Sequence, residues 1–253
     1  MHVFDHQDAL TPYIQMLKSN GKRIGFVPTM GALHDGHLSL VEYAKNQCDQ
    51  VVVSIFVNPT QFAPGEDFDV YPRDTNRDVS LLKSIGVDCV YLPDVLDIYP
   101  NGPIITVKAG DAAKGLESDF RPHFFDGVCT VVHRLFEIAQ PDIAVFGEKD
   151  YQQMMVIREM VETHHLKIDI VGAPIVRDSH GLALSSRNAY LNKDEMEIAR
   201  CLNVVLKSGP SNAQTLLDVG FEKIDYIEER WGRILAAAWI GKTRLIDNCE
   251  IKE

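Results

Sequence analysis

Two histidines flank a glycine in the segment Val27-Pro-Thr-Met-Gly-Ala-Leu-His34-Asp-Gly36-His37. The segment lies between a short β-branched run and an amphipathic stretch, which predicts the end of a strand and the start of a helix. Backbone N–H groups and the helix dipole favour phosphate at that position, and glycine lets the backbone approach a ligand closely. We expect both histidines on the first helical turn, on one side, donating to phosphate oxygens. Two alternatives are a pair of surface histidines and a metal pair, although helical metal ligands usually stand four residues apart.

A second candidate segment is Ser185-Ser186-Arg187-Asn188, which offers two hydroxyl groups and a guanidinium group. On a flexible loop these groups could close over a triphosphate. A solvated loop or a helix cap explains the same residues, so the segment is weak evidence by itself.

Two further segments follow apolar runs. The run ending at Phe146 is followed by Gly-Glu-Lys149-Asp-Tyr-Gln-Gln, in which Lys149 could be a phosphate-binding cation or part of a solvated helix start. The run 51–57 is followed by Asn58-Pro-Thr-Gln61, whose amide side chains suit a small polar substrate. Asn58 before a proline is equally a turn former.

Several other features are expected to be structural. His133 and the pair His164-His165 lie on predicted helices, at the surface or the edge of the core, and the pair Met154-Met155 is expected in the core. No carboxylate pair, GxSxG or GxxxxGK[ST] motif is present, so hydrolase and P-loop functions lack support.

The elements expected to position these residues alternate between strand and helix. Strands are predicted at 24–27, 51–57, 87–92, 142–146 and 168–171, and helices at 38–47, 74–85, 127–139 and 151–164. The run 51–57 is apolar on both faces, as in a central parallel strand. The pattern predicts a Rossmann-like, doubly wound parallel α/β sheet whose ligands bind at the carboxyl ends of the strands.

The pattern changes near residue 175. We expect residues 1–175 to form a Rossmann-like catalytic domain that binds the nucleotide, and residues 176–253 a small α+β lid domain carrying the Ser185–Asn188 segment. In the second part, 193–207 is predicted as a helix and 243–247 as a strand, while 221–231 is ambiguous between the two.

Composition limits the class of protein. A chain of 253 residues with 45% hydrophobic and 24% charged residues is typical of a soluble globular protein that can bury a core. The net charge of −11 argues against nucleic-acid and anionic-membrane binding, so a phosphate ligand needs a local basic pocket. Five scattered cysteines indicate reduced thiols in a cytoplasmic protein, and no apolar run is long enough for a leader or a membrane span.

Taken together, the motifs PTMGALHDGH, VSIFVNPTQF, YPRD, GEKDYQQ, RDSHGLALSSRNAYL and GKTRLIDN resemble the pantothenate synthetase (pantoate–β-alanine ligase) family of the HxGH nucleotidyltransferase superfamily. This resemblance implies ATP-dependent condensation of (R)-pantoate with β-alanine through a pantoyl-adenylate, with release of pyrophosphate and AMP. It also implies that Mg²⁺ arrives with ATP and that the protein is a homodimer, a state that periodicity alone does not predict. No metal held by the protein itself is expected.

The resemblance also implies site residues. The residues implied at the ATP site are Met30, Gly31, Ala32, Leu33, His34, Asp35, Gly36, His37, Gly147, Glu148, Lys149, Asp150, Val176, Leu184, Ser185, Ser186 and Arg187. Among these, His34, His37, Lys149, Ser185, Ser186 and Arg187 are implied to be catalytic, with His37 as the proton donor. The residues implied at the substrates are Pro28, Thr29, Asn58, Gln61, Glu117, Arg121 and Gln153.

The sequence departs from the family pattern twice. The family has RPxHF where this chain has Arg121-Pro-His-Phe124-Phe, so phenylalanine stands in the place of histidine. Near 227–234 the chain lacks about a dozen residues of the family pattern, which predicts a trimmed lid. We expect both changes to affect KM or closure rather than reaction type.

Two other functions remain open at this level. One is another HxGH transferase that makes a nucleotide-linked product without an amine. The other is a nucleotide-binding regulatory protein that has lost catalysis through the shortened lid, although intact His34, His37, Lys149, Ser185 and Arg187 argue against it.

Overall fold

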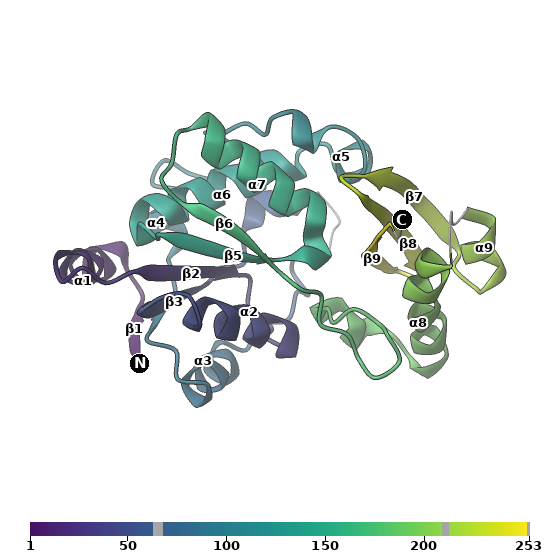
Figure 1. Cartoon of the computed structure of the whole chain (residues 1–253), viewed down its shortest axis with the longest axis horizontal. Helices are drawn as coiled ribbons and strands as arrows, with labels where there is room; N and C mark the ends of the chain where they lie inside the picture. Colours follow the sequence, from purple (N-terminus) through teal and green to yellow (C-terminus); the bar gives the residue numbers. More distant parts are fainter. Residues whose placement is uncertain (63–67, 209–212, 252–253) are drawn as a thin grey trace. The chain divides into compact units, whose positions relative to one another are not determined.

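A computed structural model describes residues 1–62, 68–208 and 213–251 in two compact units (Figure 1). Unit 1 comprises Met1–Leu33, His37–Gly147 and Gln152–Ala173. Unit 2 comprises His34–Gly36, Glu148–Tyr151 and Pro174–Glu253. Two short pieces that interrupt unit 1 therefore belong to unit 2 by their contacts.

Unit 1 is built on a six-stranded sheet in the order β1-β4-β3-β2-β5-β6, and every described pair in it is parallel. The strands are β1 (His2–Phe4), β2 (Ile24–Thr29), β3 (Gln50–Ile55), β4 (Cys89–Tyr91), β5 (Ile143–Gly147) and β6 (Asp169–Ala173). From β2 the chain adds β3 and β4 on one side and then β5 and β6 on the other. The direction of winding therefore reverses between β2 and β5.

Helices cover both faces of this sheet, with α2 and α3 on one side and α6 and α7 on the other (Figure 1). The helices of unit 1 are α1 (Gln7–Ser19), α2 (Asp35–Lys45), α3 (Thr75–Ser84), α4 (Val95–Ile98), α5 (Glu117–Phe120), α6 (Phe124–Ala139) and α7 (Tyr151–Thr163), with the short 3₁₀ helices η1 (Pro59–Gln61) and η2 (Asp111–Ala113). A third 3₁₀ helix, η3 (Glu148–Asp150), follows β5. The first residues of α2 and α7, and all of η3, fall in unit 2.

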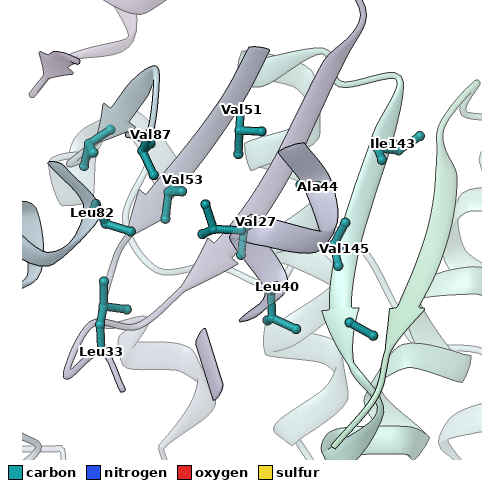
Figure 2. Close-up of a cluster of buried hydrophobic side chains, with 13 residues drawn as sticks. Val27, Leu33, Leu40, Ala44, Val51, Val53, Leu82, Val87, Ile143 and Val145 are labelled. Atoms are coloured by element: carbon teal, nitrogen blue, oxygen red, sulfur yellow. The ribbon is translucent and has the colours of Figure 1, made fainter. Parts of the chain in front are cut away.

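Alternate residues of neighbouring strands form the core under α2 and α3. Val27, Val53 and Val145 are fully buried in one cluster with Leu40 of α2 and Leu82 of α3 (Figure 2). On the opposite face Phe26 meets Phe136 of α6 edge to face, with 6.1 Å between ring centres. Because side chains alternate along a strand, this two-sided burial explains the continuous apolar runs in the sequence.

Unit 2 contains an antiparallel sheet of β7 (Lys223–Arg230), β8 (Arg233–Ile240) and β9 (Thr243–Glu250). It also contains α8 (Lys193–Lys207), α9 (Ala213–Asp218) and the 3₁₀ helix η4 (Ser186–Tyr190). Leu202, Leu206, Leu216, Ala236 and Ala238 share one buried cluster. The alanines of β8 are completely buried, so the small side chains allow a close approach of the neighbouring elements.

The predicted α/β class with a parallel sheet and a small C-terminal α+β part is confirmed. The ambiguous segment 221–231 contains the strand β7, and the predicted helix 193–207 coincides with α8. The elements β1, α1, α4, α5, α9 and β8 were not predicted. None of the helices in the described ranges is both long and apolar enough to cross a bilayer.

One sequence expectation about histidines is wrong. The helix α7 ends at Thr163, so His164 and His165 lie beyond it, and His165 has a left-handed backbone with φ of 53°. Its conformation ends the helix, because a residue in that region cannot continue a right-handed turn. His133 does lie on α6 and is half-buried.

Candidate active site

Three chain segments leave the carboxyl ends of the adjacent strands β3, β2 and β5. Phe56 follows β3, Met30 follows β2, and Glu148 follows β5. The point between β2 and β5, where the winding reverses, is where ligands bind in open parallel sheets. The sequence motifs of the candidate site therefore begin at the edge that the fold itself makes available.

The segment after β2 is held by a buried carboxylate. Asp78 of α3 is 1% exposed, and its two oxygens accept the backbone N–H groups of Ala32 at 2.8 Å and Leu33 at 2.9 Å. Gly31 and Ala32 have positive φ values of 81° and 51°, a conformation that costs alanine about 1–2 kcal/mol. The carboxylate stabilises this strained turn immediately before the first histidine.

Sequence reasoning missed Asp78. Its only signal in the sequence is an acidic residue in the first turn of a predicted helix, which is common because it complements the helix dipole. Its burial against a segment 46 residues earlier is a tertiary feature. The remaining strand positions of the motif are regular: Thr29 is buried, its hydroxyl donates to the Ser54 carbonyl at 2.8 Å, and Pro28 pairs with Ser54 across β2 and β3.

The glycine of the HxGH motif has a steric explanation. Nδ1 of His34 accepts the N–H of Gly36 at 3.1 Å, and a Cβ at position 36 would lie 2.8 Å from Cε1 of the same imidazole. Any side chain there would displace the ring. Because Nδ1 is an acceptor in this contact, the proton of the neutral ring sits on Nε2, which makes Nε2 the donor atom of the ring.

The expectation that both histidines lie on the first helical turn is wrong for His34. The helix α2 begins at Asp35, so His34 precedes it and uses its imidazole to bind an N–H at the helix N-terminus. Such N–H groups have no partner within the helix, so the imidazole of His34 satisfies one of them from the position just before the helix. His37 is half-buried in the first turn of α2, as expected.

The segment after β3 forms a polar corner. Asn58 is 1% exposed and caps η1; its Oδ1 accepts the Tyr99 hydroxyl at 2.5 Å, and its Nδ2 donates to Oε1 of Gln61 at 3.0 Å and to the Gly127 carbonyl at 3.3 Å. Burial raises the pKa of Tyr99, which keeps the hydroxyl protonated as a donor. The side chain of Asn58 is thus engaged by the protein and orients Gln61.

Arg121 contacts two other expected substrate residues within unit 1. Its Nη2 donates to the Gln61 carbonyl at 2.8 Å, and its Nη1 lies 3.7 Å from a carboxylate oxygen of Glu117. The backbone N–H of Glu117 donates in turn to Oε1 of Gln152 at 3.0 Å. Gln152, buried next to the expected substrate residue Gln153, was not singled out, although it lies within the same motif.

The first departure from the family pattern has a visible outcome. The Arg121 guanidinium carbon lies 3.9 Å from the centre of the Phe124 ring, a cation–π contact. His123 is exposed at the start of α6 and makes no side-chain cap hydrogen bond. The phenylalanine therefore packs on the arginine in the place where the family pattern has histidine.

In unit 2 the segment after β5 is held by the C-terminal sheet. Nδ2 of Asn248 donates to the carbonyls of Glu148 at 2.8 Å and Lys149 at 3.0 Å. Arg233 binds the Glu148 carboxylate at 2.7 Å and lies 4.5 Å from the centre of the Tyr151 ring. Nζ of Lys149 lies 3.8 Å from the Asp150 carboxylate, and its side chain is 19% exposed, so its charge is only partly solvated.

The second expected nucleotide segment is a hairpin followed by η4. The N–H of Leu184 donates to the Val176 carbonyl at 2.9 Å, and Arg177 pairs with Ala183. Ser185 caps η4 by accepting the Arg187 N–H at 3.3 Å, which is the helix-cap alternative considered from the sequence. Ser186 and Arg187 lie half-buried in η4.

The second departure from the family pattern, the missing residues near 227–234, is a tight turn in the structure. Trp231 and Gly232 join β7 to β8, and both have positive φ values, of 54° and 71°. Two consecutive left-handed residues make the type I′ turn that fits the twist of a two-residue hairpin. The missing residues are thus replaced by the shortest regular connection.

Metal ligands do not cluster in the described ranges. No group of three or more His, Cys, Asp or Glu side chains there could hold a metal ion. The cationic groups on the expected nucleotide segments are Lys149 in the segment after β5 and Arg187 in η4. An acidic chain needs local positive charge of this kind wherever it binds phosphate.

Comparison with known proteins gives one consistent result. The model of the pantoate–β-alanine ligase family matches residues 2–250. The pantothenate synthetase of Mesorhizobium japonicum is 49% identical over 270 residues, covering 96% of this chain and 95% of the relative. That of Aquifex aeolicus is 43% identical over 271 residues, with 96% of both chains covered.

Solved structures agree with the sequence relatives. The pantoate–β-alanine ligase of Francisella tularensis, in complex with β-γ ATP and β-alanine, superposes with a TM-score of 0.91 at 40% identity, covering 99% of this chain and 97% of that one. The pantothenate synthetase of Thermus thermophilus gives a TM-score of 0.87 at 39% identity, with 99% of both chains covered.

Proposed function

The chain belongs to the pantoate–β-alanine ligase family, and from this premise we propose that it condenses (R)-pantoate with β-alanine at the expense of ATP, through a pantoyl-adenylate. The observation that carries the proposal is the His34–Gly36 hydrogen bond, which fixes the imidazole tautomer with its proton on Nε2. A donor fixed in advance stabilises charge that develops on phosphate oxygens.

The first step makes the carboxylate reactive. A pantoate carboxylate oxygen attacks the α-phosphorus of ATP, the bond from that phosphorus to the bridging oxygen breaks, and pyrophosphate leaves with the electron pair. We assign His34 to hydrogen bonding at the phosphates and His37 to donating a proton to the leaving pyrophosphate. No side chain forms a covalent intermediate, so the residues position groups and stabilise charge.

The second step forms the amide. The neutral amine of β-alanine attacks the acyl carbon of pantoyl-adenylate, the carbon–oxygen bond to phosphate breaks, AMP leaves, and the nitrogen loses a proton. The mixed anhydride is sensitive to water, so exclusion of water is part of the mechanism.

The nucleotide is assigned to four segments. These are Met30–His37, Gly147–Asp150, Val176 and Leu184–Arg187. Lys149 and Arg187 supply positive charge, and Ser185 and Ser186 supply hydroxyl groups. In a chain with a net charge of −11, local cations of this kind are needed to attract a triphosphate.

The organic substrates are assigned to unit 1. Gln61 and Gln153 hold pantoate, and Gln61 also lies near the incoming β-alanine. Arg121 contacts both Gln61 and Glu117 and so orients these two residues. Asn58 acts through Gln61, and Pro28 and Thr29 form the adjoining end of β2.

Four further features complete the proposal. Mg²⁺ enters as Mg–ATP, bound to phosphate oxygens. Residues 1–175 form the catalytic domain, and residues 176–253 form a lid domain that limits access of water. The protein is a homodimer. It acts in the cytoplasm, in accord with its five free cysteines.

The test is the release of AMP and pyrophosphate from Mg–ATP with pantoate alone, with β-alanine alone, and with both. AMP release should require both pantoate and β-alanine, and it should be lost in the His37→Ala variant. Pyrophosphate with pantoate but no amide would mean that only the adenylation half is intact. Absence of pyrophosphate in every mixture would overturn the proposal in favour of another nucleotidyl transfer or of nucleotide binding without catalysis.

A further inference from the structure

Two adjacent residues of β9, Asp247 and Asn248, have no role in the reaction as proposed. Both are buried, with exposed fractions of 3% and 1%. They belong to the GKTRLIDN motif at 241–248, to which no substrate contact is assigned. Burial of a charge and an amide in the small unit is costly unless each has well-placed partners.

Asn248 binds the segment after β5 through the nitrogen of its side-chain amide. Its Nδ2 donates to the two consecutive carbonyls of Glu148 and Lys149, and its Oδ1 accepts Nη1 of Arg233 at 2.7 Å. Since carbonyls can only accept, the amide nitrogen must face them, so the orientation of the side chain is fixed by its partners. Arg233, 7% exposed, adds the bond to the Glu148 carboxylate.

Asp247 holds the other nucleotide segment. Its oxygens accept Nη1 and Nη2 of Arg177 at 2.6 and 2.9 Å, a bidentate pair. Arg177 also donates to the Gly181 carbonyl at 3.0 Å, within the hairpin that leads to Ser185. Because successive side chains of a strand point to opposite faces, the two residues reach these segments from the two faces of one sheet.

We propose that Asp247 and Asn248 are positioning residues for ATP, which fix the 148–150 segment relative to the 176–187 segment through one strand. The inference rests on the proposed function, since it takes both segments as nucleotide-binding. Misplacement of a reacting group by about 1 Å can lower a rate by about 100-fold, so small shifts of these segments matter. Strand β9 therefore controls ATP affinity and adenylation, while leaving attack by β-alanine largely unaffected.

The main variant is Asn248→Asp, which keeps the shape of the side chain and replaces two donors by an acceptor facing two carbonyls. Pantoate-dependent exchange of pyrophosphate into ATP should fall about 10- to 100-fold, with a raised KM for ATP. Amide formation from supplied pantoyl-adenylate and β-alanine should change less than about threefold. A merely structural role would lower both half-reactions together.

The matched control is Glu250→Gln. Glu250 lies two residues along the same strand and accepts Nη2 of the same Arg233 at 3.2 Å, but its side chain is 78% exposed. Exposed ion pairs contribute little, so this variant should keep the exchange rate and the KM for ATP. Asn248→Ala, which removes the donors without adding charge, replaces Asn248→Asp if circular dichroism shows that the latter does not fold.

The second variant, Asp247→Asn, tests whether one strand couples the two segments. In the double variant, the increase in the KM for ATP should be smaller than the product of the increases in the two single variants. The reason is that either change already breaks the link between the two segments through β9. Independent, fully multiplicative effects would overturn the coupling. Wild-type exchange rates in both single variants would overturn the positioning role.

Calorimetric titration with Mg–ATP separates this inference from the proposed function. If the wild-type protein shows no pantoate-dependent exchange, the proposed function fails, and ATP binding still tests the inference. At least tenfold weaker binding of Mg–ATP in Asn248→Asp than in Glu250→Gln supports the positioning role, and equal binding contradicts it.

Discussion

The segments that follow β2 and β5 are held in opposite ways. Residues 32 and 33 are hydrogen-bonded to Asp78 of the same unit, 46 and 45 residues along the chain. Residues 148 and 149 are tied to Asn248, 100 and 99 residues along the chain and in the other kind of sheet. In the first case a side chain accepts from backbone N–H groups, and in the second a side chain donates to backbone carbonyls.

This difference shows that a loop at a strand end can be fixed either by a side-chain acceptor for its N–H groups or by a side-chain donor for its carbonyls. The turn at Gly31 and Ala32 is strained and leaves N–H groups that a carboxylate can satisfy. The 3₁₀ turn at 148–150 leaves carbonyls, which an amide nitrogen satisfies. We expect the charged, buried contact of the first segment to be the less tolerant of substitution.

The strongest test of this comparison is Asp78→Asn. The amide can accept only one of the two N–H groups and presents a donor to the other, so one buried N–H loses its partner. The free energy of unfolding should fall by about 3 kcal/mol, and pantoate-dependent exchange should fall about 100-fold, a larger loss than in Asn248→Asp. Chemical denaturation and isotope exchange measure the two effects.

Asp74→Asn is the matched control on the same helix. Asp74 caps α3 by accepting the Arg77 N–H at 3.0 Å, and asparagine is as good a cap as aspartate. Its stability should stay within about 0.5 kcal/mol of wild type. Equal losses in the two variants would mean that the effect belongs to the helix rather than to the buried carboxylate.

Gly36→Ala separates activity from stability within the first segment. The added Cβ displaces the imidazole of His34, so the rate of pyrophosphate release should fall about 10- to 100-fold. Alanine is the better helix former by up to about 1 kcal/mol, so the melting temperature should hardly change. Glu42→Ala, at an exposed position of α2, should leave both quantities unchanged, and a normal rate in Gly36→Ala would show that the imidazole contact is dispensable.

Gly127→Ala tests the polar corner formed by Asn58, Gln61 and Tyr99 in unit 1. A Cβ there would lie 2.5 Å from the backbone oxygen of Thr60, so α6 and η1 would have to separate. We expect a loss of about 2 kcal/mol in stability and a KM for pantoate raised about tenfold, with the KM for ATP little changed. Glu137→Ala on the same helix is the control and should leave both quantities unchanged. An unchanged KM for pantoate in Gly127→Ala would show that the polar corner has no role in pantoate binding.

The smallest expected effect concerns the hairpin of unit 2. Burial raises the pKa of Asp178, but hydrogen bonds from the Leu182 and His180 N–H groups and from Arg200 outweigh it and lower the pKa below its usual value. The carboxylate therefore stabilises the fold above a pH of about 4 and loses that contribution as the pH falls further. Asp178→Asn should cost about 0.5 kcal/mol at pH 7, and the difference from wild type should shrink only below pH 4. A difference that is constant down to pH 3 would contradict this.

Much of the fold was predictable, because the central strands are apolar on both faces and the helices between them are amphipathic. The strand β1 has only three residues, and α1 has a proline at position 12, so neither gives a clear signal. The strand β8 is rich in alanine, a helix former, and its conformation is decided by pairing with β7 and β9. Family membership, expected from the motifs, is confirmed.

The site was predictable only as far as its motifs reach. The segments that contain His34, Lys149 and Ser185 follow from sequence, and their roles remain predictions. Asp78 and the partners of Asn248 could not be found, since their meaning depends on which distant backbone groups they meet. A single sequence does not distinguish an aspartate that is buried, such as Asp78, from one at the surface.

The connection between 148–151 and β9 also bears on how the protein comes into being. During synthesis the Glu148–Tyr151 segment leaves the ribosome about a hundred residues before Asn248 does. The parallel sheet of unit 1 is already complete at Ala173, yet the backbone carbonyls of this segment have no Asn248 to bind until β9 has been made. All six strands of the parallel sheet are therefore synthesised well before the 148–151 segment can meet its partner in β9, and on the proposed function we expect the ability to use ATP to arise late in translation.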